Sequence, residues 1–340
     1  NFSKIFEKLI HSQISQFFES KLSDYLTGFR RNHNTQYALL EMIEKWKTFI
    51  NRGFKVGALM MDLSKAFDTL NHYLLISKLE AYGFDERSIT FIKRYFTDRY
   101  QRTKVGNEYS SWRKVTTGVP QGSILGPLFF NIFINDMFLF TNKCSICNYA
   151  DDNTLYACNK DENKIMQDLL QDFTNLSNWF YENYLVLNAD KCHFMTLGFK
   201  SPLPNFIFKK EVIKNSPEEK ILGITIDNKL TFESHLETIC KVANQKLNAL
   251  CRLSKFTSPY QRYLLVNSYI KSQFSYCPLI WMFSSRKSNH RINKIHERSL
   301  RIILNDYFSS FEDLLTVLDK KTIHQRSINL YLIEVLKYMN

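Results

Sequence analysis

The sequence lacks internal repeats, low-complexity tracts and linkers rich in glycine and serine, so nothing in it indicates a repeat array or a string of tethered modules. It also lacks a long apolar run. The most apolar stretch, residues 127–140, is interrupted by Asn131, Asn135 and Asp136 and is too short to span a membrane. No signal peptide is evident. Because the chain opens on Asn1 rather than Met, we expect it to be a fragment.

Paired cysteines are lacking as well. The seven cysteines are odd in number and scattered, so we expect reduced thiols in an intracellular protein of the nucleus and cytoplasm. Cys144 and Cys147 form one CxxC motif without a second pair. Packing within a strand is therefore favoured over half of a zinc site.

The composition predicts a large, folded and basic protein. A hydrophobic content of 44% over 340 residues is enough for a large core and more than one subdomain. The formal net charge of +12 is uneven, because residues 229–340 contribute +9 and residues 1–228 only +3. An acidic centre beside a basic third suits a polyanionic partner held around bound metal ions.

Two adjacent carboxylates stand out near the middle of the chain. Residues 144–158 contain Tyr149-Ala150-Asp151-Asp152 between short apolar pieces that favour strands, which predicts a hairpin with both carboxylates at its tip. Neighbouring anions repel, and a divalent cation would offset that repulsion. Most Asp-Asp turns are simply solvated, so a metal site requires a third carboxylate on a neighbouring strand.

Asp62 is the candidate for that third carboxylate. It ends the apolar run 56–61, which is short enough to be a buried strand. A carboxylate at the end of a buried strand is costly unless it is paired or bound to metal. Two hard cations bridged by carboxylates are a common device for phosphoryl transfer.

Five motifs in this order resemble the palm of a reverse transcriptase from non-LTR (LINE-like, jockey-type) retrotransposons. The resemblance covers roughly residues 1–310. The motifs are Asp62-Leu63-Ser64-Lys65-Ala66-Phe67-Asp68, Gly118-Val119-Pro120-Gln121-Gly122-Ser123, Tyr149-Ala150-Asp151-Asp152, Asn188-Ala189-Asp190-Lys191-Cys192 and Leu222-Gly223-Ile224-Thr225-Ile226-Asp227.

The resemblance implies an α+β right-hand polymerase fold with an antiparallel-sheet palm. We expect partial fingers at 1–60, the palm at 61–228, a helical thumb at 229–305 and a C-terminal helical extension at 306–340. The implied activity is RNA-directed DNA synthesis for retrotransposon copying. Its partners would be an RNA template, a DNA primer or target strand, and dNTPs, with no obligatory protein partner.

The resemblance also implies roles for particular residues. The metal ligands and catalytic carboxylates would be Asp62, Asp151 and Asp152, holding two Mg²⁺ ions, for which Mn²⁺ is a possible substitute. Lys191 would act as an acid toward departing pyrophosphate or only electrostatically. Nucleotide contacts would come from Leu63, Phe67, Gln121 and Gly122, of which Gln121 and Gly122 would contact the incoming nucleotide or the template. Phe67 would be a steric gate beside the sugar, which its spacing from Asp62 favours over an ordinary core position. Leu222 and Gly223 would form the primer grip.

Basic residues elsewhere are open to two interpretations. Lys287, Arg291, Lys294, Arg298 and Arg301 recur on one face of a predicted helix, and we call them the basic stripe. The stripe is either a solvated helix face or a track for nucleic-acid phosphates. Arg30 and Arg31 are equally compatible with contacts to template or triphosphate and with a solvated turn.

The periodicity predicts the following elements. Helices are expected at 2–22, 35–50, 72–82, 86–97, 123–137 (with Ser123 as N-cap), 165–180 and from 232 onward. Strands are expected at 56–61, 185–187, 193–197 and 221–226, and hairpins at 101–115, 144–158 and 203–214.

Two rival functions remain open. One is a degenerate transposon-derived fragment that binds nucleic acid without catalysis. The other is an RNA-dependent RNA polymerase, which shares the carboxylate pattern but typically has a smaller or polar residue where Phe67 stands.

Overall fold

The computed structural model describes residues 2–200 and 203–339. Contacts divide the chain into an N-terminal unit, Asn1–Ala38 with Lys45–Ser216, and a C-terminal unit, Leu39–Glu44 with Pro217–Asn340. The predicted division between palm and thumb after residue 228 remains a prediction, and the contact boundary falls earlier, at Pro217. The N-terminal unit combines helices with antiparallel strands, and the C-terminal unit is mainly helical with one antiparallel hairpin. The architecture is therefore α+β.

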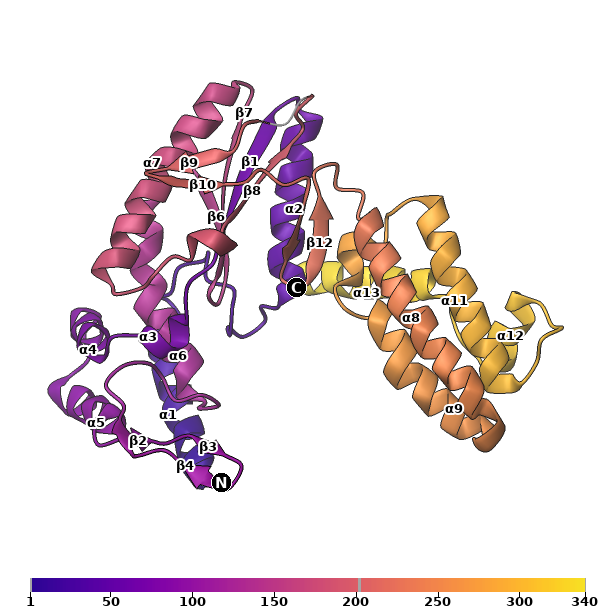
Figure 1. Ribbon diagram of the computed structural model, residues 1–340, viewed down its shortest axis with the longest axis horizontal. Helices are drawn as coiled ribbons and strands as arrows, with labels where there is room; N and C mark the ends of the chain where they lie inside the picture. Colours follow the sequence, from indigo (N-terminus) through magenta and orange to yellow (C-terminus); the bar gives the residue numbers. More distant parts are fainter. Residues whose placement is uncertain (1, 201–202, 340) are drawn as a thin grey trace. The chain divides into compact units, whose positions relative to one another are not determined.

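A four-stranded antiparallel sheet organises the N-terminal unit (Figure 1). Its strand order is β6 (Ser145–Tyr149), β7 (Asp152–Asn159), β1 (Lys55–Met61) and β8 (His193–Leu197). The central strand β1 is buried along most of its length, as its apolar sequence predicts. The strand at 56–61, the hairpin at 144–158 and the strand at 193–197 are therefore confirmed.

The two faces of this sheet pack against different helices. A side chain on Gly57 would meet Ile165 and Leu169 of α7 (Glu162–Glu182), so α7 lies against that face. On the opposite face Tyr156 contacts Trp46 of α2 (Thr35–Asn51), with 5.8 Å between ring centroids. The sheet is thus covered on both sides, and its apolar residues form the core.

The remaining helices of this unit match the predicted periodicity closely. The turn before each of two helices carries a side-chain cap, because Asn71 and Asp85 accept hydrogen bonds from the first free N–H groups. The helices are α1 (Phe2–Phe18), α3 (Ala66–Thr69), α4 (His72–Ala81), α5 (Glu86–Phe96) and α6 (Leu125–Ile134), with 3-10 turns η1 (Asn135–Phe140) and η2 (Ala189–Lys191).

Small hairpins complete the unit. The predicted hairpin at 101–115 is present, and Gly106 supplies the positive φ of 61° at its turn. The predicted hairpin at 203–214 is also confirmed. The strands are β2 (Tyr100–Gln101), β3 (Lys104–Val105), β4 (Glu108–Tyr109), β5 (Arg113–Lys114), β9 (Phe206–Phe208) and β10 (Glu211–Ile213).

Three predicted boundaries in the N-terminal unit were wrong. Helix α1 ends at Phe18 rather than at 22. Helix α6 begins with Ile124 at its N-cap and ends at Ile134, although the Ser123 hydroxyl still accepts a hydrogen bond from Gly126. Residues 185–187 form only a single bridge with the segment after β1, because that segment turns away into α3.

A hairpin and a set of helices build the C-terminal unit. The strand predicted at 221–226 is instead β11 (Glu218–Ile221) and β12 (Ile224–Asp227), joined by a tight turn. The helical pattern predicted from 232 onward is confirmed. The helices are α8 (Glu233–Leu253), α9 (Pro259–Leu265), α10 (Pro278–Trp281), α11 (Arg286–Leu304), α12 (Phe311–Val317) and α13 (Ile323–Met339), with shorter turns η3 (Ser254–Phe256), η4 (Val266–Ile270) and η5 (Lys271–Phe274).

None of the helices in the described ranges combines the length and the apolar character that crossing a bilayer would require.

Candidate active site

The sheet register brings two of the predicted carboxylates together. The ladder between β1 and β7 ends where Met61 pairs with Asn153, so Asp62 directly follows the end of β1 and Asp152 begins β7 beside it. Tyr149 pairs with Asp152 on the next strand. Paired residues of an antiparallel ladder point to the same face, so the side chains of Tyr149 and Asp152 share one face of the sheet. Asp151 lies beside them in the turn between β6 and β7.

Asp62 is held by a backbone hydrogen bond and has one side-chain oxygen that no described residue satisfies. Its carbonyl accepts from the N–H of Asn188 at 2.9 Å. Its Oδ2 atom is buried and has no hydrogen-bond partner within residues 2–200 and 203–339. The Nζ atom of Lys191 is 3.7 Å from that oxygen and belongs to a largely exposed side chain. Lys191 therefore lies beside Asp62, and its role toward pyrophosphate remains a prediction.

The charges in this region favour an additional cation. Partial burial raises the pKa of Asp152, and repulsion by Asp151 and then Asp62 raises it further. Carboxylate oxygens are the donors that hard divalent cations prefer. The donor set fits such an ion in its chemistry. Among residues 2–200 and 203–339, however, no three acidic, histidine or cysteine side chains converge closely enough to hold a metal by themselves.

Buried amides support the turn that carries Asp151 and Asp152. Asn148 donates from Nδ2 to the carbonyl of Ala150 at 2.7 Å and to Oδ1 of Asn153 at 2.9 Å. Asn153 in turn donates to the carbonyl of Asp151 at 3.0 Å. Both asparagines are fully or almost fully buried. Their position on either side of the Asp pair was visible in the sequence but was not interpreted.

A second segment lies directly against this turn. A Cβ atom on Gly28 would be 2.4 Å from the backbone nitrogen of Ala150, so only glycine fits there without movement. The hydroxyl of buried Thr27 donates to the Asn148 carbonyl, and Asn131 of α6 donates to the Gly28 carbonyl at 2.7 Å. No periodic pattern reveals these contacts, because they join segments more than 100 residues apart.

Phe67 lies between the core and the carboxylate face. Its ring is stacked on Phe130 with 4.3 Å between centroids. It also meets Phe29 edge-on at 6.2 Å, and Phe29 lies 6.5 Å from the ring of Tyr149. The side chain is half-buried, so it packs in the core and still presents an edge to solvent. Leu63, by contrast, is buried, and its contact with a nucleotide remains a prediction.

The loop between Gly118 and Gly122 is fastened to the segment after β1. Gly118 has φ of 80° and donates its N–H to the carbonyl of Leu70. A Cβ atom on Gly118 would lie 2.5 Å from the carbonyl oxygen of Asp68. The first glycine is therefore required for close approach to the protein's own backbone rather than to a ligand. Gly122 also has a positive φ, of 77°, but faces open space.

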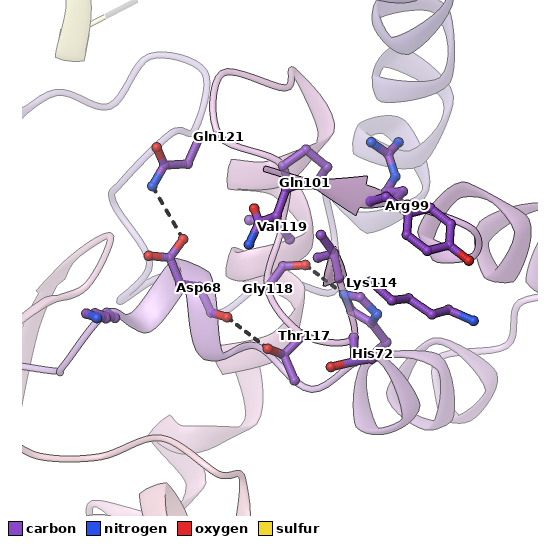
Figure 2. A pocket seen from close by; sticks show the side chains of 14 residues that line it. Asp68, His72, Arg99, Gln101, Lys114, Thr117, Gly118, Val119 and Gln121 are labelled. Atoms are coloured by element: carbon purple, nitrogen blue, oxygen red, sulfur yellow. Dashed lines mark hydrogen bonds between the residues drawn. The ribbon is translucent and has the colours of Figure 1, made fainter. Parts of the chain in front are cut away.

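A cavity of about 640 Å³ lies beside this loop. Figure 2 shows Asp68 and Gln121 on one side of it and Arg99 and Lys114 on the other. Gln121 donates to Asp68 at 3.4 Å, and His72 donates from Nε2 to the Gly118 carbonyl at 2.7 Å. Of the predicted site residues only Gln121 lines the cavity.

Comparison with known proteins identifies the family. Residues 1–226 match the family described as reverse transcriptase (RNA-dependent DNA polymerase). The chain belongs to the reverse transcriptase family.

Among its relatives is the probable RNA-directed DNA polymerase from transposon BS of Drosophila melanogaster, 30% identical over 323 residues that cover 88% of this chain and 35% of that protein. The RNA-directed DNA polymerase from mobile element jockey of the same organism is 27% identical and covers 88% of this chain and 34% of that protein. The chain thus spans about a third of the length of these curated relatives.

A solved structure of apo telomerase from Candida tropicalis matches the fold. It has a TM-score of 0.50 at 13% identity and covers 92% of this chain and 51% of that one. The predicted family and α+β polymerase fold are therefore confirmed. Reverse transcriptases generally use divalent metal ions, which is consistent with the carboxylate donors described above.

The predicted primer grip of this reverse transcriptase chain lies in a turn. Leu222 and Gly223 have φ of 46° and 84° and connect β11 to β12. The Tyr276 hydroxyl donates to the Leu222 carbonyl at 2.6 Å. The predicted strand was wrong because both residues adopt the left-handed conformation, which ends a strand. Their contact with a primer remains a prediction.

The predicted basic residues divide into paired and exposed groups. Arg30 donates to the carbonyls of Ser23 and Leu26, so it supports its own turn, whereas Arg31 is exposed. In the basic stripe of α11, the three arginines have partners within the chain, with Arg291 bonded to Glu237, Arg298 to Asn248 and Arg301 to Glu297. Lys287 and Lys294 are exposed.

Proposed function

We propose that this chain is the polymerase part of a retrotransposon enzyme that copies an RNA template into DNA. It would extend a primer 3′-hydroxyl with dNTPs and release pyrophosphate. The observation that supports the proposal is that Asp62 follows the end of β1 beside the start of β7, close enough to act electrostatically on Asp152 next to the Asp151 turn. We propose two Mg²⁺ ions, for which Mn²⁺ can substitute, as the cofactor. The seven free thiols suit action inside the cell, in the nucleus and cytoplasm.

The carboxylates would hold the ions through Asp62 and Asp151, with Asp152 completing the set. When bound, the ions lower the pKa of the attacking hydroxyl and stabilise the charge on the leaving phosphate. The protein's own residues supply position and proton transfer. Lys191, which lies beside Asp62, is placed to donate a proton or a positive charge to pyrophosphate.

The nucleotide and template would be held by the elements around the carboxylates. We assign the sugar contact to Phe67, the base-pair or backbone contact to Gln121 and Gly122, and the primer contact to Leu222 and Gly223. The cavity beside Gln121 has a basic wall that includes Arg99 and Lys114, which suits the phosphates of an incoming RNA template.

Primer extension on an RNA template tests the proposal directly. Asp151→Asn and Asp62→Asn should each reduce extension by roughly 10³-fold or more, because each removes a hard ligand from a two-ion site. Asp24→Asn, at an exposed aspartate of the same unit, should retain wild-type extension.

Metal-dependent stabilisation gives a second readout that does not need catalysis. Mg²⁺ should raise the Tm of the wild type, because it offsets the repulsion among the carboxylates, and should raise that of Asp151→Asn less. Extension at wild-type rate by folded Asp151→Asn would refute the assignment. Nucleic-acid binding without extension by the wild type would instead favour a catalytically inactive fragment.

A further inference from the structure

The C-terminal unit contains a mostly buried lysine that has no acidic partner among the described residues. Lys271, in η5, is 9% exposed. No carboxylate of the described residues forms an ion pair with it. Burial lowers its pKa, repulsion by the nearby Arg326 and Lys320 lowers it further, and Tyr263 opposes part of this shift. A desolvated cation that lies among other cations is costly unless an anion joins it.

Two more cations surround Lys271. The Nζ atoms of Lys271 and Lys320 lie 6.0 and 5.5 Å from the centre of the Tyr263 ring. Arg326, on α13, is exposed and close enough to act electrostatically on Lys271. We call Lys271, Lys320 and Arg326 the cationic cluster. Its members come from three segments, and it extends from the mostly buried Lys271 to the exposed Arg326.

The groups beside the cationic cluster do not neutralise it. Neither ring nitrogen of buried His296 has a hydrogen-bond partner in the part of the chain that the structure describes. Burial lowers its pKa to about 4, and Lys271 and Arg326 contribute, so it is neutral at pH 7. The Tyr263 hydroxyl is a hydrogen-bonding group, and Asn267 and Lys320 lower its pKa. The cluster therefore keeps a net positive charge with polar groups around it.

Irregular backbone sets the position of Lys271. The chain changes from α9 to a π-helical turn at Val266–Ile270 and then to the 3-10 turn that begins at Lys271. π-Helical turns are rare in proteins, and those that occur are often found at functional sites. This turn carries Asn267 and separates Tyr263 from Lys271, so it fixes the spacing of the groups that face one another.

We propose that the cationic cluster binds a phosphate group. Lysine and arginine together suit a phosphate, because its oxygens accept hydrogen bonds from several donors and its charge neutralises the ammonium of the mostly buried Lys271 side chain. The phosphate comes from a nucleic-acid strand if the chain is a polymerase, and to that extent the proposal rests on the proposed function. The same chemistry would also take free phosphate or pyrophosphate. The site lies beyond the residues that match the family, 1–226.

The cationic cluster differs from the basic stripe in one respect that matters for binding. Each arginine of the stripe already bonds to Glu237, Asn248 or Glu297. No residue of the cationic cluster pairs with a carboxylate among the described residues. An incoming phosphate therefore does not have to displace an acidic partner from the cluster.

A thermal-shift experiment with inorganic phosphate tests the site without nucleic acid or catalysis. Tm is measured in phosphate and in chloride at equal ionic strength, for the wild type, Lys271→Met and Lys241→Met. Lys241 is an exposed lysine of α8, so its variant matches the change in net charge. Phosphate also stabilises proteins by exclusion from their surface, and both variants keep that effect. We expect the rise in Tm from chloride to phosphate to be larger for the wild type and Lys241→Met than for Lys271→Met.

Single-stranded RNA provides the second arm. Fluorescence anisotropy at several salt concentrations, with no dNTP present, should show that Lys271→Met lowers affinity about tenfold at low salt, as expected for a lost charge-assisted hydrogen bond. The slope of log K against log salt should flatten by ~0.7, the value for one phosphate contact on a single strand. Arg326→Gln, at an exposed residue, should act in the same direction and provides a variant with little risk to folding.

The outcomes separate the source of the phosphate from the site itself. If Lys271→Met loses both the extra gain in Tm with inorganic phosphate and the affinity for RNA, the site binds a strand phosphate. If it loses only the gain in Tm, the site binds free phosphate or pyrophosphate. Wild-type behaviour of both Lys271→Met and Arg326→Gln in both arms overturns the proposal. Neither arm requires polymerisation, so failure of primer extension would leave this test unaffected.

Discussion

Phe67 shows how one side chain can be tied to the core and to a reaction at once. Its stack on Phe130 at 4.3 Å explains why an aromatic ring is stable there without any substrate. The contact with Phe29, which in turn neighbours Tyr149, places the ring close to the carboxylate face. Packing therefore holds the ring where a steric gate would be needed.

Replacing Phe67 should change the choice of sugar. In Phe67→Ala, we expect the ratio of kcat/KM for ribonucleotides to that for deoxynucleotides to rise, because the space beside the 2′ carbon opens. Stability should fall by about 1–3 kcal/mol, since the stacked ring is only half-buried. Phe67→Tyr keeps the ring and should keep wild-type discrimination. An unchanged ratio in folded Phe67→Ala would assign the side chain to packing alone, and a wild type that prefers ribonucleotides would favour an RNA polymerase.

His296 should make stability depend on pH. Its pKa is lowered from 6.5 to about 4 in the folded protein. Between these values the unfolded chain binds a proton that the folded chain does not, so stability is lost as pH falls from 6.5 toward 4. The loss should reach about 3 kcal/mol, from ~1.4 kcal/mol per pKa unit. In urea unfolding at pH 8, 6 and 4.5, His296→Leu should lose less stability on acidification than the wild type. Equal losses of stability on acidification in the two proteins would contradict the prediction. The difference in unfolding free energy between them at pH 8, where His296 is neutral in both states, reports packing alone.

At the scale of elements, the hairpin of β6 and β7 depends on a segment far away in the sequence. Residues 26–28 pass against its turn, and Gly28 leaves no room for a side chain beside Ala150. The positions of Asp151 and Asp152 are therefore determined partly by Gly28, Thr27 and the buried amides of Asn148 and Asn153.

Gly28→Ala should damage catalysis more than folding. The added methyl group must push the Ala150 backbone aside, which we expect to cost about 1–3 kcal/mol in stability. The turn would shift by a fraction of an ångström to an ångström, and primer extension should fall roughly 10- to 100-fold. Gly53→Ala is the matched control, because its φ of 75° is strained for alanine but no atom lies within 4 Å of the new Cβ. Similar loss of extension in both variants would attribute the effect to general destabilisation.

The elements that the sequence predicted well are those with a strong local pattern. The apolar run before Asp62, the helical stripes of α2 and α7 and the Gly106 turn all carry their signal within a few residues. The strand expected at 221–226 failed because its apolar residues continue through Leu222, whose left-handed conformation has no sequence signal of its own.

The candidate site was predictable where it depends on motifs, and not where it depends on long-range contacts. The three carboxylates and Lys191 followed from the motif order. The support from Thr27, Gly28 and Asn131 depends on segments brought together only by the fold. The cavity beside Gln121 was missed for the same reason, since its walls come from the segment after β1 and from residues 99–121.

For the molecule as a whole, the uneven net charge determines where a polyanion can bind. The +9 of residues 229–340 lies entirely outside residues 1–226, which match the family. Within that part, Arg291 already bonds to a carboxylate, Glu237. Among the described residues, no carboxylate pairs with Lys287, Lys294 or the cationic cluster, so these cations can meet a phosphate without displacing one.

The salt dependence of nucleic-acid binding should therefore come from the lysines of the basic stripe more than from its arginines. Lys287→Gln with Lys294→Gln should flatten the slope of log K against log salt by about 1.5, since each lost phosphate contact contributes ~0.7–0.9. Arg291→Gln with Arg298→Gln should flatten it less, because a phosphate must first displace Glu237 and Asn248. The loss should be nearly independent of template sequence, because phosphates carry no base information. Slopes equal to the wild type in both double variants, with helix content retained by circular dichroism, would make the stripe a solvated surface and leave the cationic cluster as the phosphate contact of this unit.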